Sequence, residues 1–123
     1  MPEGTLAERL DLLERTGVIS TPVRLAVERA ASNLRGRLGR SLDSSTGQLL
    51  MTHLAMALMR AASGEAIEET SEELEDELED FSAEQVLARA VLGDAAEPLG
   101  ITLPEAEVQL VAAYLVALRQ EAP

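Results

Sequence analysis

His53 is the only histidine of the chain, and it lies in the most apolar stretch of the sequence, from Leu49 to Arg60. The unperturbed pKa of an imidazole is close to physiological pH, so this side chain can act as a base, a metal ligand or a nucleophile. It can equally be a neutral core residue whose nitrogens are satisfied by hydrogen bonds. These two interpretations lead to different functions.

Arg60 follows His53 by seven residues, which is close to two helical turns, so both side chains lie on the same side of a helix. It lies about 10.5 Å farther along the axis, but helical side chains lean toward the N-terminus and bring it back toward His53. A nearby guanidinium disfavours imidazole protonation and can hold an attached phosphoryl group. Alternatively, Arg60 pairs with Glu65 or Glu69, and His53 bonds to a backbone carbonyl. Leu49, Met56 and Ala57 share this side of the helix.

The composition argues against most catalytic chemistry. The chain has no cysteine and a single histidine, which argues against disulfides, thiolate chemistry and a zinc centre. The absence of lysine excludes a Schiff base, and the serines stand where helix caps and turns need hydroxyls. We expect no enzymatic activity, no metal and no cofactor.

Charge is distributed unevenly along the chain. Residues 1–60 contain eight arginines and six acids, whereas residues 61–123 contain two arginines and sixteen acids. The acidic half repels phosphate backbones, so we expect no direct contact with nucleic acid. Ten of the acids lie in residues 65–80, where they form either a solvated face or a docking surface for a basic partner. Neither a membrane span nor a signal peptide is readable, which predicts a cytoplasmic protein.

Helix signals recur along the chain, and strand signals do not. Capping residues predict six helical segments, which begin at Thr5, Thr21, Ser44, Thr70 or Ser71, Ser82 and Thr102. Thr5 with Glu8, Ser82 with Gln85 and Thr102 with Glu105 have the spacing of capping boxes. The expected ends lie at Gly17, at Gly36 or Gly39, at Ser63, near Phe81, before Pro98 and after Leu118. The fold class is therefore all-α, a bundle of five to six helices.

The segment from Gln48 to Arg60, followed by Gly64 and Glu65, resembles the first histidine motif of the PRD family, the phosphotransferase-system regulation domains. That motif reads His-Leu-x-x-Ala-x-x-Arg, with apolar residues before it and a glycine after it. A second segment, Leu103 to Leu115, resembles the closing helix of the family, in which Pro and Glu precede a second histidine. The resemblance covers roughly residues 40–120, and we expect residues 1–123 to form a single PRD-like domain. The short length is most similar to the stand-alone PRD proteins of sugar-utilisation gene clusters.

This resemblance implies a regulatory helical bundle, commonly a homodimer. Its histidines accept phosphate from the histidine phosphocarrier protein or from an enzyme II B component, and this controls transcription. The motif match implies that His53 is the phosphoacceptor and that Arg60 is the arginine that stabilises the phosphate. The second histidine position is degenerate, because Tyr114 stands there. Any effect on transcription is then indirect, through dimer or partner contacts.

Other functions stay open at this point. The missing second histidine favours a dimeric adaptor that is not phosphorylated. An accessory subunit of an enzyme in a sugar-utilisation pathway is a third hypothesis. Solvent exposure of His53 is the observation that best separates them.

Overall fold

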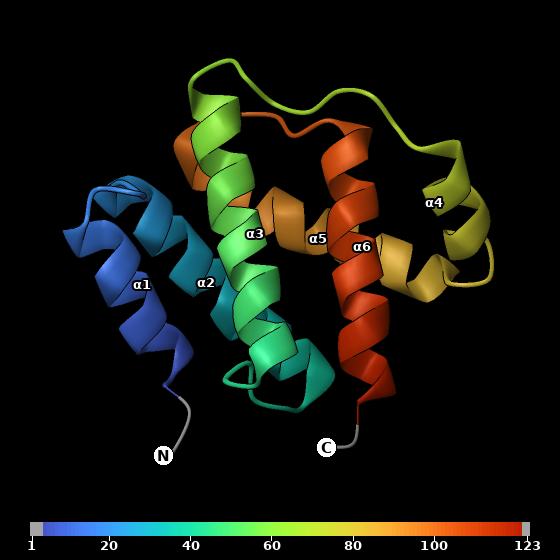
Figure 1. Cartoon of the computed structure of the whole chain (residues 1–123), viewed down its shortest axis with the longest axis horizontal. Coiled ribbons are helices and arrows are strands. Elements are labelled where there is room, and N and C mark those ends of the chain that lie inside the picture. The colour runs from blue at the N-terminus through green and yellow to red at the C-terminus, as the bar shows by residue number, and fades with distance from the viewer. Residues whose placement is uncertain (1–3, 122–123) are drawn as a thin grey trace.

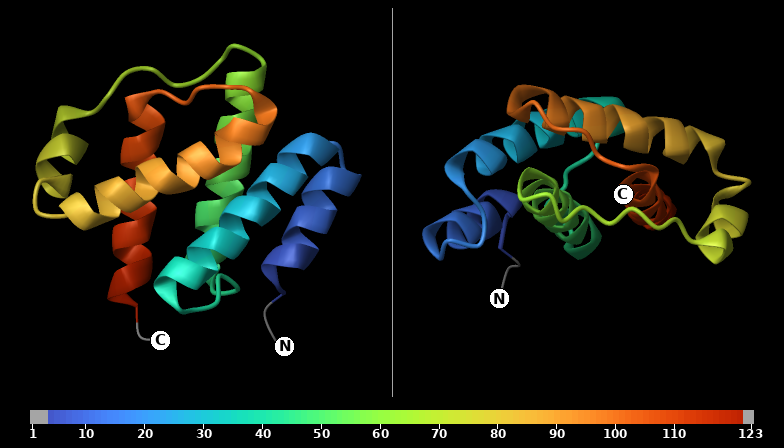
Figure 2. Two further views of the ribbon diagram at one scale, coloured as in Figure 1. Left: turned by 180° about the vertical axis from the view of Figure 1, so that it is seen from behind. Right: turned by 90° about the horizontal axis from the view of Figure 1, so that it is seen from above.

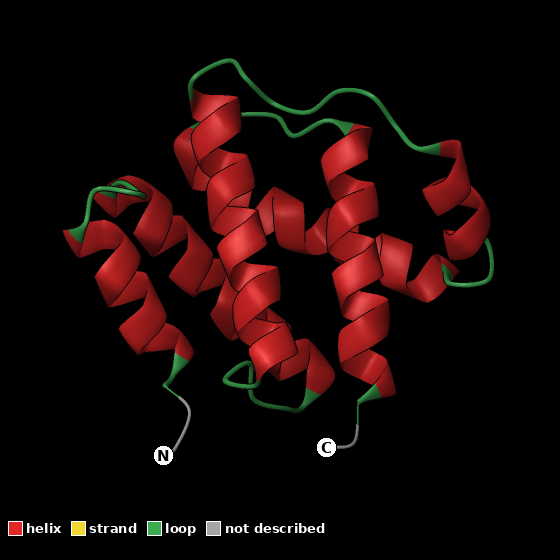
Figure 3. Cartoon of the chain, in the orientation of Figure 1, coloured by secondary structure: helices red, strands yellow, loops and turns green. Residues whose placement is uncertain are grey.

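The computed structural model describes residues 4–121. Over this range the chain folds into six α-helices and one 3₁₀ helix and contains no strand, which confirms the all-α class (Figure 3). None of the helices in that part of the chain is both long and apolar enough to cross a bilayer. The elements are α1 Leu6–Arg15, α2 Thr21–Leu38, α3 Ser45–Ala62, α4 Glu72–Leu78, α5 Ser82–Ala96, η1 Glu97–Leu99 and α6 Glu105–Gln120.

The helices form two layers. Helices α1, α3, α6 and α4 lie side by side in one layer, and α2 and α5 cross behind them (Figures 1 and 2). Helices α3 and α6 are antiparallel, so the end of α3 lies beside the beginning of α6 (Figure 1). Residues 63–71 cross the same end of the molecule to reach α4 (Figure 1). The functional site depends on the antiparallel contact of α3 with α6.

Aliphatic side chains build the core, as the scarcity of aromatic residues requires. Helix α3 contributes Leu50, Leu54 and Leu58, spaced four residues apart on one stripe and fully buried. Each buried leucine contributes about 2 kcal/mol through removal of apolar surface from water. Alanines alternate with these larger side chains and let the helices approach closely; those fully buried include Ala30, Ala55, Ala88 and Ala112.

Several predicted helix ends are confirmed by side-chain caps. The Thr5 hydroxyl accepts the amide of Glu8 at 3.2 Å, and the Ser44 hydroxyl accepts the amide of Gly47 at 3.1 Å. Helix α2 ends at Gly39, whose φ of 66° is left-handed and therefore favours glycine. In these places local hydrogen bonding agrees with the tertiary fold.

The predicted cap of α2 is wrong by one residue. Ser20 is the cap and accepts the amide of Val23 at 3.3 Å, while Thr21 is already helical. Pro22 then occupies the first turn, where its missing amide hydrogen loses no helical bond. Both residues carry a hydroxyl, so the residue type alone does not show which of them is the cap.

The predicted capping boxes of the last two helices are also wrong. Helix α5 follows Phe81, and α6 follows Pro104, and neither start has a side-chain cap. Ser82 is itself helical, and the Gln85 amide donates to the Leu78 carbonyl at 2.7 Å instead of closing a box. Helix α4 ends at Leu78, not near Phe81 as predicted, and this bond satisfies the carbonyl of its last residue. Thr102 lies in the loop that precedes α6.

Candidate functional site

His53 and Arg60 lie on the side of α3 that faces α6, as their spacing predicts. Both side chains approach the same residue, Glu107, which belongs to the first turn of α6. Arg60 pairs with an acid, but that acid comes from α6, not from the segment after α3 where Glu65 and Glu69 lie. The pairing is tertiary, so no local sequence pattern reveals it.

Glu107 is a fully buried carboxylate. It accepts two hydrogen bonds from Arg60 Nη2, at 3.0 Å to Oε2 and at 3.3 Å to Oε1. A buried charge needs such a partner because transfer out of water is costly. Glu107 also lies in the first turn of α6, where the positive end of the helix dipole stabilises a negative charge. Its separation of seven residues from Tyr114 places both on one face of α6, but this spacing alone does not show that Glu107 contacts α3.

The His53 side chain is 18% exposed, and its buried Nε2 atom has no hydrogen-bond partner. Its Nε2 atom lies 3.8 Å from Glu107 Oε1, which is longer than a hydrogen bond. Within residues 4–121, His53 Nε2 and Arg60 Nε are buried side-chain nitrogens without a hydrogen-bond partner. Neither the expected backbone carbonyl nor a close carboxylate satisfies Nε2.

Burial lowers the pKa of His53 below its ordinary value of 6.5. The positive charge of Arg60 lowers this pKa further, whereas the negative charge of Glu107 opposes the shift. Burial is the largest of these causes. The imidazole is therefore neutral at pH 7, which is the form that can act as a nucleophile.

Tyr114, at the degenerate second histidine position, packs against His53. The two ring centroids are 5.4 Å apart, and the ring planes are tilted by 38°. The structure thus brings together His53, Arg60 and Tyr114, the three residues singled out from the sequence, and adds Glu107, which lies against His53 and Arg60. In the described part of the chain, no group of His, Asp and Glu side chains is arranged to hold a metal ion.

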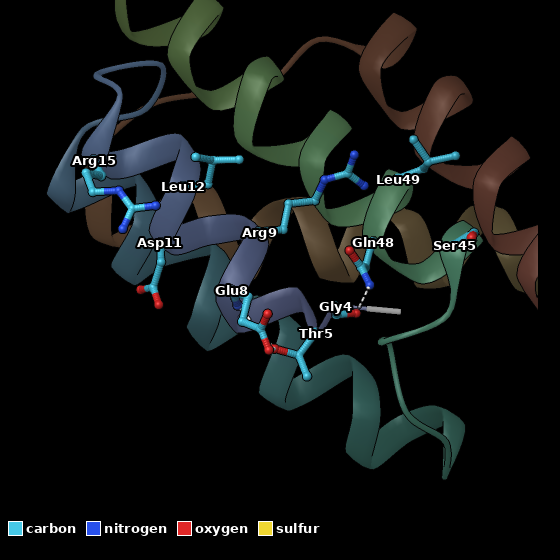
Figure 4. A pocket seen from close by; sticks show the side chains of 10 residues that line it. All are labelled: Gly4, Thr5, Glu8, Arg9, Asp11, Leu12, Arg15, Ser45, Gln48 and Leu49. Atoms are coloured by element: carbon cyan, nitrogen blue, oxygen red, sulfur yellow. Dashed lines mark hydrogen bonds between the residues drawn. The ribbon is translucent and has the colours of Figure 1, made fainter. Parts of the chain in front are cut away.

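A separate hollow of about 750 Å³ lies between α1 and the first turn of α3 (Figure 4). His53 does not line it, and its charged walls carry both signs. The Gln48 amide closes one side by donating to the Gly4 carbonyl at 2.6 Å (Figure 4). The lining residues are Gly4, Thr5, Glu8, Arg9, Asp11, Leu12, Arg15, Ser45, Gln48 and Leu49. We find no chemistry in this hollow that competes with the α3–α6 cluster.

Comparison with known protein families matches the chain to the PRD domain over residues 28–118. The matched range contains the whole α3–α6 cluster. Comparisons with curated proteins and with solved structures give no match. The match covers most of the chain, and it includes the histidine, the arginine and the closing helix that the sequence motifs had indicated. The chain therefore belongs to the PRD family, the phosphotransferase-system regulation domains.

Proposed function

We propose that this chain is a phosphotransferase-linked transcriptional regulatory domain that accepts one phosphoryl group, on His53. PRD domains are regulatory rather than catalytic. The observation that carries the proposal is an imidazole whose Nε2 lies 3.8 Å from a carboxylate that Arg60 already binds. In this proposal residues 1–123 form one cytoplasmic domain, and Arg60 stabilises the phosphoryl group.

The transfer uses the His53 Nε2 lone pair as the nucleophile. A bond forms between Nε2 and phosphorus, and the phosphorus–nitrogen bond of the donor phosphohistidine breaks. Its electron pair returns to the donor imidazole, which takes up a proton, while the His53 ring loses the proton on Nδ1. The product carries a charge of about −1.5 to −2 on the side of α3 that faces α6. That charge can change dimer or partner contacts.

The donor in this proposal is the histidine phosphocarrier protein or an enzyme II B component, and the domain acts as a homodimer. The acidic half of the chain disfavours a direct role on nucleic acid, since the net charge of the whole chain is −12. The regulatory effect then passes through a partner.

Phosphotransfer from labelled phosphoenolpyruvate, with enzyme I and the phosphocarrier protein, tests the proposal. We expect about one label per chain in the wild type and none in His53→Gln, because His53 is the only histidine. Tyr114→Phe is the matched control, since it removes a hydroxyl and keeps the ring beside His53. Equal label in wild type and His53→Gln would contradict the assignment, as would an unlabelled wild type with an active donor.

A non-phosphorylated dimeric adaptor, or an accessory protein of a sugar-utilisation pathway, is the second candidate. Two observations favour it: Tyr114 stands at the second histidine position, and His53 Nε2 is buried. An adaptor would sediment as the same oligomer before and after incubation with the donor system. A phosphorylated regulator would change its oligomeric state or its partner affinity when labelled.

A further inference from the structure

Glu107 occupies the space between the two groups that a phosphohistidine would need. We propose that the space between His53 Nε2 and Arg60 is a built anion site, which Glu107 fills while His53 is unmodified. The phosphoryl group on Nε2 takes the place of Glu107 against Arg60. The exchange rests on the proposed function, but the anion site can be tested without any phosphoryl donor.

The first argument is distance. Only 3.8 Å separates His53 Nε2 from Glu107 Oε1, so a phosphoryl group bonded to Nε2 would bring its oxygens against the carboxylate. Two anions in a buried space repel each other strongly. The phosphoryl group is held by a covalent bond, whereas Glu107 is held by hydrogen bonds to Arg60. Glu107 is therefore the anion that leaves.

The second argument is the unused hydrogen-bonding capacity of the site. Arg60 Nη2 donates to both carboxylate oxygens of Glu107, and the buried Nε of Arg60 has no hydrogen-bond partner among the described residues. A phosphoryl group offers three acceptor oxygens, and a guanidinium binds phosphate through two parallel bonds. The exchange would satisfy a donor that Glu107 leaves unpaired.

The third argument concerns the consequence for α6. Once displaced from Arg60, Glu107 would be a buried charge without a partner, which would strongly destabilise the folded state. The first turn of α6 must then move to bring the carboxylate to water. Gln109 follows Glu107 by two residues, at the start of the second turn of α6, and its side chain accepts the amide of Ser71 at 3.0 Å, just before α4. A modification on α3 would thus be transmitted to α6 and α4.

The anion site is tested first in Glu107→Ala, with inorganic phosphate as the probe and chloride at matched ionic strength as the reference. We expect phosphate to raise the unfolding temperature of this variant and to shift its ¹⁵N-histidine signals saturably. The single histidine makes those signals unambiguous. Glu105→Ala is the matched control, because Glu105 starts the same helix but pairs with the exposed Arg89. Equal effects of phosphate and chloride would overturn the anion site. Glu107→Ser, which also empties the space beside Arg60, replaces Glu107→Ala if the latter does not fold.

The exchange is tested by phosphotransfer to Glu107→Gln. Glutamine keeps the shape of Glu107 and removes the charge that repels the incoming group, so we expect labelling several-fold faster than in the wild type, with phosphorus bonded to Nε2. Slower or unchanged labelling, or a phosphoryl group on Nδ1, would overturn the exchange. Absence of label in wild type and variant alike would refute the proposed function and the exchange together, and the phosphate titration would still decide whether the anion site exists.

Discussion

The chemistry of His53 is decided by its neighbours on two helices. From α3 alone, an imidazole followed by an arginine seven residues later has two readings, a phosphate site or a surface ion pair. Glu107 on α6 changes the surroundings of both residues, because it binds Arg60 and faces His53 Nε2. The pair His53 and Arg60 was predictable from spacing within one helix. Glu107 was not, because its role depends on how α6 packs on α3.

The first prediction at the residue scale concerns pH. Folding lowers the pKa of His53 below 6.5, so the unfolded chain binds this proton more tightly than the folded chain does. The contribution of His53 to stability is therefore fully present above pH 6.5 and is lost as the pH falls through the lower, folded-state pKa. We expect the free energy of unfolding of the wild type, minus that of His53→Gln, to rise between about pH 5.5 and 7.5.

Urea unfolding of both proteins across this range measures the difference. Subtraction removes the carboxylates, which titrate in both chains. Three groups face the imidazole, namely Glu107, Arg60 and Tyr114, and all three remain in the variant. A flat difference, or one that falls with pH, would show that the folded state does not favour the neutral ring.

At the scale of elements, the sequence predicts helices better than it predicts their starts. Apolar spacing located all six α-helices of the described residues, because this signal is local, whereas the predicted hydroxyl caps were correct only for α1, α3 and α4. The starts of α5 and α6 were misplaced, since Phe81 and Pro104 precede them without a side-chain cap. A tertiary bond also went unforeseen at α1, where the Leu6 amide donates to the distant Asp43 carboxylate at 2.9 Å. Such bonds have no signature in a local pattern.

A prediction at this scale concerns the start of α3, the helix that carries His53. A Cβ at Gly47 would lie 2.6 Å from the Leu42 carbonyl oxygen and 2.8 Å from two further backbone atoms of Leu42. Backbone atoms cannot give way as a flexible side chain does, so the loop before α3 must shift. We expect Gly47→Ala to lower the free energy of unfolding by about 1–3 kcal/mol, as other overpacked sites do. Chemical denaturation measures the loss.

Gly36→Ala is the matched control, because Gly36 is also helical but has no atom within 4 Å of its added Cβ. It should raise stability by about 0.5–1 kcal/mol through the better helix propensity of alanine. Equal stability of the two variants would mean that the contact of Gly47 with Leu42 does not constrain the start of α3.

At the scale of the whole molecule, the acidic residues of the second half of the sequence gather on α4 and in the segments around it. Helix α4 carries acids in its first turn, where they favour the helix, but it has no basic residue in its last turn. The C-terminal end of a helix disfavours negative charge. Exposed acids nevertheless lie at this end of α4, namely Glu77, Glu79 and Asp80. The net charge of −12 adds long-range repulsion, which salt screens.

We expect this repulsion to make the protein more stable as salt rises from about 0.01 M to 0.1 M, where the Debye length falls from roughly 30 Å to 10 Å. The triple variant Glu77→Gln, Glu79→Gln and Asp80→Asn should be more stable than the wild type at the lower salt and should gain less from added salt. Thermal unfolding at the two concentrations measures both effects. Glu28→Gln is the control, because Glu28 pairs with Arg24 in the balanced half of the chain and its loss should bring no gain. If the triple variant responds to salt as strongly as the wild type, the acidic segment is not the source of the repulsion, and its charges are available to a basic partner without cost to the fold.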